Sequence, residues 1–238
     1  MRDPDPSVYV WAWALVFGVV GGHPDVASSY NNLGLAFLGR GEYDNAIAYH
    51  EKAVGIWMET LGPEHPRIAT AYHGTGTAYD KKGIYGRAII NYEEALAIWL
   101  KTLGPNHPDV ATCYNNLGLA HDNKDEPEKA IAFYEKSLAI RLKTLGDDHP
   151  DVAITYNNLG ASHIRKKEFD QAIGYFQKDL AIMLKARGAE HLSVATSHHD
   201  IGTVYAAKGD KEAAMTSLLK AKAIREKKLG LKLSLIHI

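Results

Sequence analysis

Apolar positions along this chain recur with the spacing of helices, and short glycine-containing turns interrupt them. The first helical face consists of residues three and four positions apart: Tyr30, Leu33, Gly34 and Phe37,. After a break at residues 39–41, residues 43–57 form a second face with the same spacing. Gly62 and Pro63 then end this helix, because glycine followed by proline is a strong helix terminator. The pattern predicts a helix, a turn and a second helix.

This two-helix pattern occurs five times in the chain. Its marker is a histidine that recurs every 42 residues without insertion or deletion: His23, His65, His107, His149 and His191,. Four of these histidines precede a proline, which suits the first helical position because its missing N–H costs nothing there. We therefore expect five repeats at residues 23–64, 65–106, 107–148, 149–190 and 191–230.

Two small residues occupy fixed positions in every copy. The glycines are Gly34, Gly76, Gly118, Gly160 and Gly202, and the alanines are Ala46, Ala88, Ala130, Ala172 and Ala214. Because glycine inside a helix costs up to about 1 kcal/mol relative to alanine, we expect a neighbouring backbone to approach closely at the glycine position. A larger side chain there should force the two helices apart.

These residues, in this order, resemble the tetratricopeptide repeat, and the resemblance extends from residue 23 to about residue 229. The 42-residue period and the LGPxHPDVA joint at Leu103 to Ala111 are similar to kinesin light chains and nephrocystin-like proteins. The resemblance implies an all-α fold, a right-handed α-α superhelix of five helix-turn-helix repeats. Kinesin light chains also have a heptad coiled coil that holds the motor, and this chain has no similar segment. Attachment to a motor is therefore not implied.

A few positions depart from the family pattern without changing the period. Pro127 replaces an aromatic residue, Thr75 replaces leucine, and Asp179 stands where alanine is usual. We expect Asp179 to mark an exposed seam between repeats. Trp57 and Trp99 lie on second helices, and we expect them to be partly exposed packing residues.

The stacking of such repeats leaves one stripe of the first helices on a concave surface. This stripe varies between copies while the packing positions repeat, as expected of a recognition surface. A carboxamide both donates and accepts hydrogen bonds, so it can pair with an extended peptide, and relatives bind peptides through asparagines at these positions. The candidate partner-binding residues are Asn31, Asn32, His73, Asp80, Lys81, Asn115, Asn116, Asp122, Asn157, Asn158, Arg165 and His199.

Two features qualify this binding hypothesis. Only Lys81 and Arg165 add positive charge to the stripe, so a ligand of mixed polar and apolar character fits better than a terminal carboxylate. The alternative is that the asparagines cap helices or bridge to a neighbouring repeat.

The charge and cysteine content disfavour some classes of partner and indicate a cellular location. The 27 basic and 28 acidic residues give a net charge of -1, which disfavours nucleic acid and membrane surfaces as partners. The single cysteine, Cys113, excludes an intramolecular disulfide framework and suits a reducing compartment, so we expect a cytoplasmic protein,.

Catalytic, metal and cofactor sites are not expected. Five of the twelve histidines mark repeat joints one full repeat apart, and His121 and His163 occupy an aromatic packing position. His198, His199 and Asp200 are adjacent, but neighbouring helical residues point about 100° apart and cannot easily share one ion. We therefore do not expect an enzyme.

The two ends differ from the repeats. Residues 1–22 contain a thirteen-residue apolar run at 8–20, too short to span a bilayer,. It fits a helix that caps the first repeat, a stretch outside the native reading frame, or a signal or anchor segment. Residues 231–238 look non-native, because LSLIHI matches the translation of a common sequencing adapter. We expect the native protein to continue, and the uncovered last repeat to promote end-to-end association.

The sequence thus predicts a protein-protein interaction scaffold or adaptor that binds a peptide or a partner domain in a concave groove. One alternative is a structural spacer or self-associating fragment of a longer repeat array. Another is a regulatory array attached to an enzyme domain outside this sequence.

Overall fold

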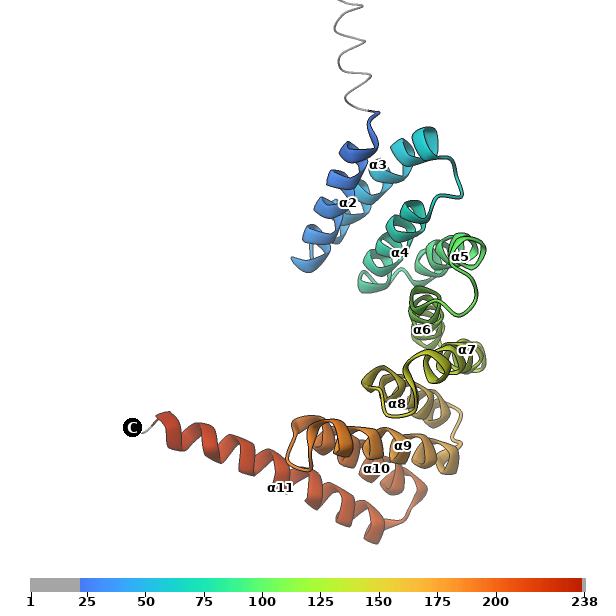
Figure 1. Cartoon of the computed structure of the whole chain (residues 1–238). Coiled ribbons are helices and arrows are strands. Elements are labelled where there is room, and N and C mark those ends of the chain that lie inside the picture. The colour runs from blue at the N-terminus through green and yellow to red at the C-terminus, as the bar shows by residue number, and fades with distance from the viewer. Residues whose placement is uncertain (1–21, 237–238) are drawn as a thin grey trace, which may run out of the picture. The chain divides into compact units, whose positions relative to one another are not determined.

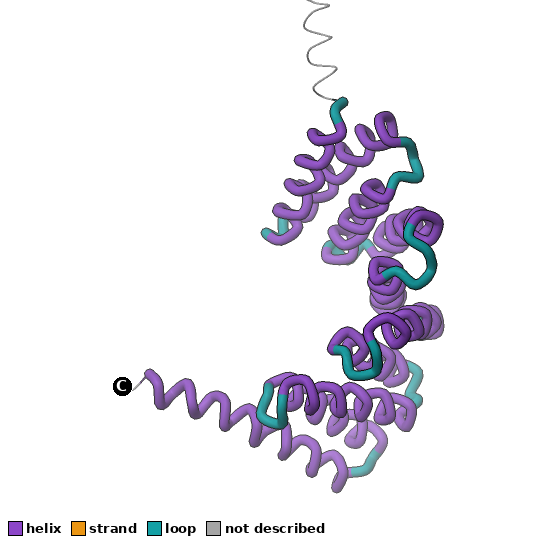
Figure 2. The backbone as a smooth tube through the Cα atoms, in the orientation of Figure 1, coloured by secondary structure: helices purple, strands orange, loops and turns teal. Residues whose placement is uncertain are grey.

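The structure is a computed structural model that describes the backbone of residues 22–236 and the side chains of residues 22–230. All regular secondary structure in this part of the chain is helical (Figure 2). The helices form consecutive hairpins: α2 (Pro24–Gly39) with α3 (Tyr43–Leu61), α4 (Pro66–Lys81) with α5 (Tyr85–Thr102), α6 (Pro108–Asn123) with α7 (Pro127–Leu145), α8 (Pro150–Arg165) with α9 (Phe169–Arg187), and α10 (Leu192–Lys208) with α11 (Lys211–Ile236).

The predictions for the two ends fall largely outside this description. Of the apolar segment 1–22, only Gly22 lies within the described residues. Of the segment 231–238, the described part is the backbone of α11 as far as Ile236. The proposed origins of both segments stay predictions.

The chain divides into two compact units, one ending at Pro105 and the other beginning at Asn106. The first unit contains α2 to α5, and α3 packs against α4 as well as α2 (Figure 1). The second contains α6 to α11, with α7 against α8 and α9 against α10. In both units the second helix of one hairpin contacts the first helix of the next. The expected all-α solenoid of helix-turn-helix repeats is confirmed for the described residues.

The repeated histidine is the N-cap of each first helix. Its Nδ1 accepts the backbone N–H two residues later, for example 3.2 Å from Asp109 to His107 and 3.1 Å from Asp151 to His149. The same bond occurs in all five copies. It satisfies a backbone donor that the helix itself cannot satisfy. The 42-residue marker is therefore a helix cap.

The glycine position is a close contact, but its main neighbour differs from our expectation. A Cβ added to Gly118 would lie 2.6 Å from Tyr134 Cε1, and one added to Gly160 would lie 2.8 Å from Phe176 Cε1. The first helix thus sits on a side chain of the second helix, mostly a ring, rather than mainly on its backbone. In the first hairpin this side chain is the imidazole of His50. A Cβ added to Gly74 of the next first helix would also lie 2.6 Å from His50.

Two expectations about exposure are wrong. Trp57 and Trp99 are buried, and the Trp57 indole N–H donates to the carbonyl oxygen of Pro24 at 3.2 Å, which satisfies its polar end. Asp179 is only 5% exposed, because the packing of α9 on α10 encloses it. The Ser197 hydroxyl donates to Asp179 Oδ2 at 2.5 Å, so a hydrogen bond within the packed seam accommodates this carboxyl group,.

Candidate partner-binding surface

In the first unit, Asn31 belongs to the interior of the first hairpin. It is 7% exposed, and its Oδ1 lies 3.0 Å from His50 Nδ1. Burial, followed by the nearby charge of His73, lowers the pKa of His50 to about 4, so this ring is neutral at physiological pH. Asn31 therefore orients a buried histidine.

Asn32 is the exposed neighbour of Asn31 and lines a small surface cavity. The cavity measures about 200 Å³, and Arg67 and Thr70 of α4 form its opposite side. A polar group of a ligand could contact Asn32 and Arg67 together. This cavity is the part of the first unit where a predicted asparagine meets solvent.

The other three predicted residues of the first unit lie along α4. His73 is half-buried against two rings of α5, with centroid distances of 5.3 Å to Tyr92 and 5.5 Å to Trp99. Asp80 is half-buried near the end of α4, and Lys81 is exposed. His73 is thus a packing group as well as a surface residue.

In the second unit the predicted asparagines form bridges between successive first helices. The Asn158 amide donates to Asn115 Oδ1 at 3.1 Å, which joins α8 to α6. The Asn157 amide donates to Asp200 Oδ2 at 3.2 Å, which joins α8 to α10. All four side chains are half-buried. These hydrogen bonds fix the spacing of the three first helices.

A second cluster lies one to two turns further along α6 and α8. Asp122 Oδ2 accepts hydrogen bonds from Ser162 at 2.6 Å and Tyr134 at 3.3 Å. Burial raises the pKa of Asp122, and these two bonds together with the charge of Arg165 oppose that shift. Arg165 is 46% exposed, with its Nε 4.0 Å from Asp122 and its Nη1 3.5 Å from Asp125. The cluster places a guanidinium group beside a largely buried carboxyl.

The two remaining predicted residues are Asn116 and His199. Asn116 is half-buried on α6. His199 is half-buried and lines a cavity of about 370 Å³ together with α11 residues such as Leu218 and Leu229. His199 therefore faces α11, whereas Asn157, at the same position of the previous repeat, faces the next first helix.

The sequence interpretation missed Asp200, which belongs to this surface, and Ser162, a buried residue whose hydroxyl donates to Asp122. Asp200 was considered only as a metal ligand, yet it occupies the 42-residue position of Asn32, Asn116 and Asn158. Reading each repeat position down all five copies would have placed it beside the asparagines. Burial raises the pKa of Asp200, and the Asn157 hydrogen bond opposes this shift.

Among the described residues, the His, Cys, Asp and Glu side chains form no group of three that could hold a metal ion. No helix in this part of the chain combines the length and the apolar character that a membrane span requires.

The model of the tetratricopeptide repeat matches residues 25–98, 83–143, 123–184 and 151–227. The chain belongs to the tetratricopeptide repeat family. No curated protein matches it. A Podosopora anserina protein of nearly identical TPR-like repeats, provisionally described as a kinesin light chain, is 27% identical with a TM-score of 0.76, and the match covers 87% of this chain and 98% of that one.

Two further structures show the same fold at lower identity. BtubC (BKLC) from P. vanneervenii is 24% identical with a TM-score of 0.77, covering 92% of this chain and 86% of that one. MamA (41-end) from Desulfovibrio magneticus RS-1 is 18% identical with a TM-score of 0.64, covering 84% and 96% respectively. Tetratricopeptide repeats are generally protein-interaction scaffolds. The resemblance to kinesin light chain-like repeat proteins, predicted from the 42-residue period, is confirmed.

Within these tetratricopeptide repeats the asparagines have a structural task. Asn31 holds His50, and Asn115, Asn157 and Asn158 bridge first helices. This is the bridging that the sequence left open as an alternative. The second-unit amides remain half-exposed, and these hydrogen bonds hold them in fixed orientations.

Proposed function

We propose that this chain is a scaffold or adaptor that binds a peptide or partner domain along its first helices. In the second unit we define the first-helix row by its residues on α6, α8 and α10: Asn115, Asp122, Asn157 and Arg165, with the exposed side chains Leu119, Ala161 and Thr203. The single observation that supports the proposal most strongly is the set of hydrogen bonds that joins α6, α8 and α10 along this row. A surface ordered before binding loses less conformational entropy when a ligand arrives.

The chemistry of the row favours a ligand with both polar and apolar groups. Leu119 is exposed beside the Asn115–Asn158 amide pair, and Arg165 offers the exposed guanidinium. Asp122 compensates part of that positive charge. A peptide that places an apolar side chain near Leu119 and an acceptor near Arg165 would match the row.

Site-specific photo-crosslinking in lysate of the source cell tests this proposal. A photoreactive residue at position 119 or 203 should crosslink the same partner polypeptide, because both positions lie on the row. The same residue at the exposed second-helix positions 143 and 171 should not. Equal crosslinking from second-helix positions would contradict the assignment.

A matched pair of arginines separates binding from a general charge effect. Arg165→Ala removes the exposed guanidinium of the row, whereas Arg187→Ala removes an exposed arginine at the end of α9. We expect only Arg165→Ala to weaken partner recovery. Recovery that is equally reduced by both changes would point to non-specific electrostatic attraction.

The remaining parts of the proposal concern chemistry and location. We infer a binding protein without catalytic activity or cofactor, whose partners are proteins rather than nucleic acid or membrane. Cys113 is buried, and burial raises the pKa of its thiol to about 12, which disfavours a nucleophilic thiolate. We also propose a cytoplasmic location.

A second candidate function, end-to-end self-association, has its own supporting observation. The α11 side chains Met215, Leu219 and Leu229 are 60%, 54% and 61% exposed, and all three line the same apolar cavity as Leu218. Light scattering against concentration should show association that Met215→Lys combined with Leu219→Lys abolishes. Ile90→Lys, at a residue 58% exposed on α5, is the matched control and should change nothing.

A further inference from the structure

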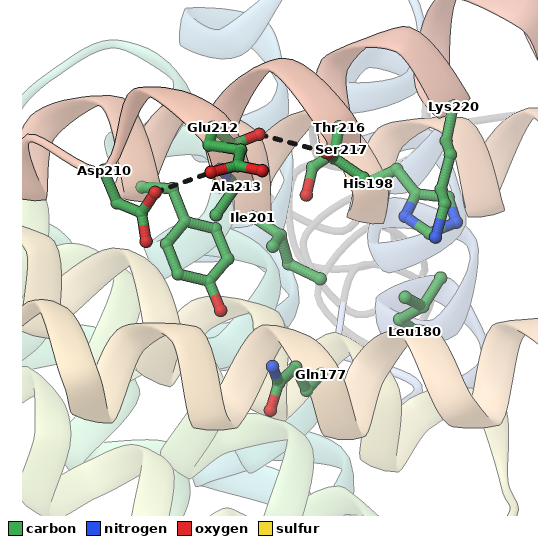
Figure 3. A pocket seen from close by; sticks show the side chains of 11 residues that line it. Gln177, Leu180, His198, Ile201, Asp210, Glu212, Ala213, Thr216, Ser217 and Lys220 are labelled. Atoms are coloured by element: carbon green, nitrogen blue, oxygen red, sulfur yellow. Dashed lines mark hydrogen bonds between the residues drawn. The ribbon is translucent and has the colours of Figure 1, made fainter.

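A cavity lies between the fifth hairpin and α9, on a different face of α10 from His199. It measures about 470 Å³ and is lined by side chains of α9, α10 and α11. Figure 3 shows the apolar side chains of Leu180 on α9 and Ile201 on α10 in the lining, and His198 close to Lys220 of α11. Gln177, Asp210 and Glu212 add polar groups to its lining. All of these residues belong to the second unit.

In three other hairpins an aromatic ring of the second helix occupies the corresponding place. In the fourth hairpin the ring of Tyr175 stacks 5.3 Å from His163 and 6.0 Å from Tyr156. The other hairpins repeat this geometry: Phe133 with His121 and Tyr114 at 5.3 and 6.1 Å, and Tyr49 with Phe37 and Tyr30 at 5.2 and 5.9 Å. The residue 42 positions after Tyr175 is Ser217, which has no ring.

A lysine lies over each of these rings. Its Nζ is 5.1 Å from the centroid of Tyr49 for Lys52, 5.2 Å from that of Phe133 for Lys136, and 5.6 Å from that of Tyr175 for Lys178. This geometry is a cation–π contact. Lys220 occupies the same position of the fifth hairpin and lines the cavity.

The fifth hairpin has therefore kept the surroundings of the ring and lost the ring itself. His198 stands in the position of Tyr156, and Tyr205 in that of His163. The second hairpin also lacks the ring, having Asn91 there. In that hairpin, however, the Arg87 guanidinium covers Tyr79 at 5.5 Å and donates to its hydroxyl at 3.0 Å. The fifth hairpin has Ala213 in the position of Arg87, and its methyl group cannot cover the ring of Tyr205 as Arg87 covers that of Tyr79.

We propose that this cavity is a docking site for an aromatic side chain, tyrosine or phenylalanine, of a partner polypeptide. The ring would stack against His198 and Tyr205 beneath Lys220, which completes the arrangement that three other hairpins form internally. An aromatic side chain can bury 150–250 Å² and prefers ring centroids about 4.5–7 Å apart, as in the internal stacks. The polar side chains Gln177 and Thr216 in the lining could contact the flanking peptide backbone.

Titration of the isotope-labelled chain with the peptide acetyl-Gly-Tyr-Gly-amide tests the proposal. We expect saturable NMR shifts centred on His198, Ser217 and Lys220, with an affinity on the order of millimolar because one ring makes few contacts. The control acetyl-Gly-Leu-Gly-amide should bind more weakly at this site. Absence of saturable shifts there, or equal binding of the leucine peptide, would overturn the proposal. If free p-cresol binds and the tyrosine peptide does not, the proposal that a polypeptide side chain occupies the cavity is contradicted.

Three variants make the test specific. Ser217→Phe restores the missing ring, so it should abolish binding while raising the midpoint of thermal unfolding. Ser217→Thr leaves the cavity open and should bind like the wild type. Lys220→Gln, at an exposed position, should weaken binding roughly two- to fivefold through loss of the cation–π contact. If Ser217→Phe does not fold, Lys220→Gln still decides, since unchanged affinity would contradict the stacked geometry.

This docking site is independent of the first-helix row. Arg165→Ala should leave the tyrosine peptide's affinity unchanged, and Ser217→Phe should leave crosslinking from position 119 unchanged. Failure of one proposal is therefore distinguishable from failure of the other. Loss of peptide binding in Arg165→Ala would contradict a site formed by α9, α10 and α11 alone.

Discussion

The fourth and fifth hairpins, α8–α9 and α10–α11, share the same helix cap and glycine contact but differ at the ring position of the second helix. Both begin with a histidine cap and place a glycine of the first helix on a large side chain of the second, Gly160 on Phe176 and Gly202 on Leu218. Beside this contact the fourth hairpin holds the ring of Tyr175, whereas the fifth has Ser217 and a cavity of about 470 Å³.

This difference separates two kinds of position in the repeat. The cap and the glycine contact are needed for a first helix to begin and to pack closely on its partner, so every copy keeps them. The ring position contributes packing to the stability of its own hairpin, but its loss leaves the hairpin fold intact. The side chain at the ring position can therefore be replaced by a smaller one, which leaves space for a ligand.

The largest expected effect comes from making the fourth hairpin resemble the fifth. Tyr175→Ser removes a half-buried ring that contacts both His163 and Tyr156, and loss of such a packed aromatic side chain costs up to about 3 kcal/mol. Chemical denaturation should show a matching decrease in the free energy of unfolding. A loss below about 1 kcal/mol would mean that the ring is not part of the packed hairpin.

A pH-dependent difference should come from the seam between these hairpins. Burial raises the pKa of Asp179 from 3.8 to about 6, the Ser197 hydrogen bond opposes the shift, and the charge of Asp200 adds to it. The folded chain therefore holds this proton more tightly than the unfolded chain, so the free energy of unfolding decreases as pH rises from about 4 to 6.

Asp179→Ser tests this dependence, since the third hairpin has Ser137 at the same position. Relative to the variant, the wild type should lose about 2 kcal/mol across that pH range, a value reduced for partial solvent screening. Denaturation curves at several pH values measure the difference. Parallel stability profiles for the two proteins would show that Asp179 does not titrate in this range.

The same substitution at two glycines of the fourth hairpin should have opposite signs. In Gly160→Ala the new Cβ would lie 2.8 Å from Phe176, so the ring must shift and the variant should lose about 1–2 kcal/mol,. In Gly174→Ala no atom lies within 4 Å of the new Cβ, so the gain in helix propensity should stabilise by up to about 1 kcal/mol. Thermal unfolding of both variants measures this, and equal shifts would contradict the ring contact.

The smallest effect concerns the feature that the two hairpins share. His149→Ala removes the acceptor for the Asp151 backbone N–H and should cost about 1 kcal/mol, as N-cap losses do. His149→Ser restores an N-cap acceptor and should recover most of the loss. Equal stability of the alanine and serine variants would show that the histidine contributes by packing rather than by capping.

The helical pairs and their positions could be predicted from sequence because each depends on local chemistry repeated five times. Proline at the first helical position, the 3.6-residue apolar period and the glycine turns all act within one copy. The partners of the glycine position could not be predicted in the same way. A glycine signals close approach but does not specify whether a backbone or a ring such as that of Phe176 approaches.

The surface residues were harder to predict because their roles depend on neighbouring repeats. The asparagine at position 31 bonds His50 within its own hairpin, whereas Asn157 bonds Asp200 in the next. Burial of Asp179 likewise depends on Ser197 across the seam. Such contacts join residues that are far apart in sequence, and a single repeat contains no signal of them. Aligning the five copies position by position shows that Ser217 stands at the position of Tyr175, and Asp200 at that of Asn158. The effect of these differences on packing and hydrogen bonding becomes visible only in the structure.

Hydrogen exchange of the chain with and without its crosslinked partner tests most directly that the first helices bind the partner. We expect slower amide exchange on binding in α6, α8 and α10, with α7 and α9 unchanged. Protection confined to α7 and α9, or no change in any helix of the second unit, would contradict it.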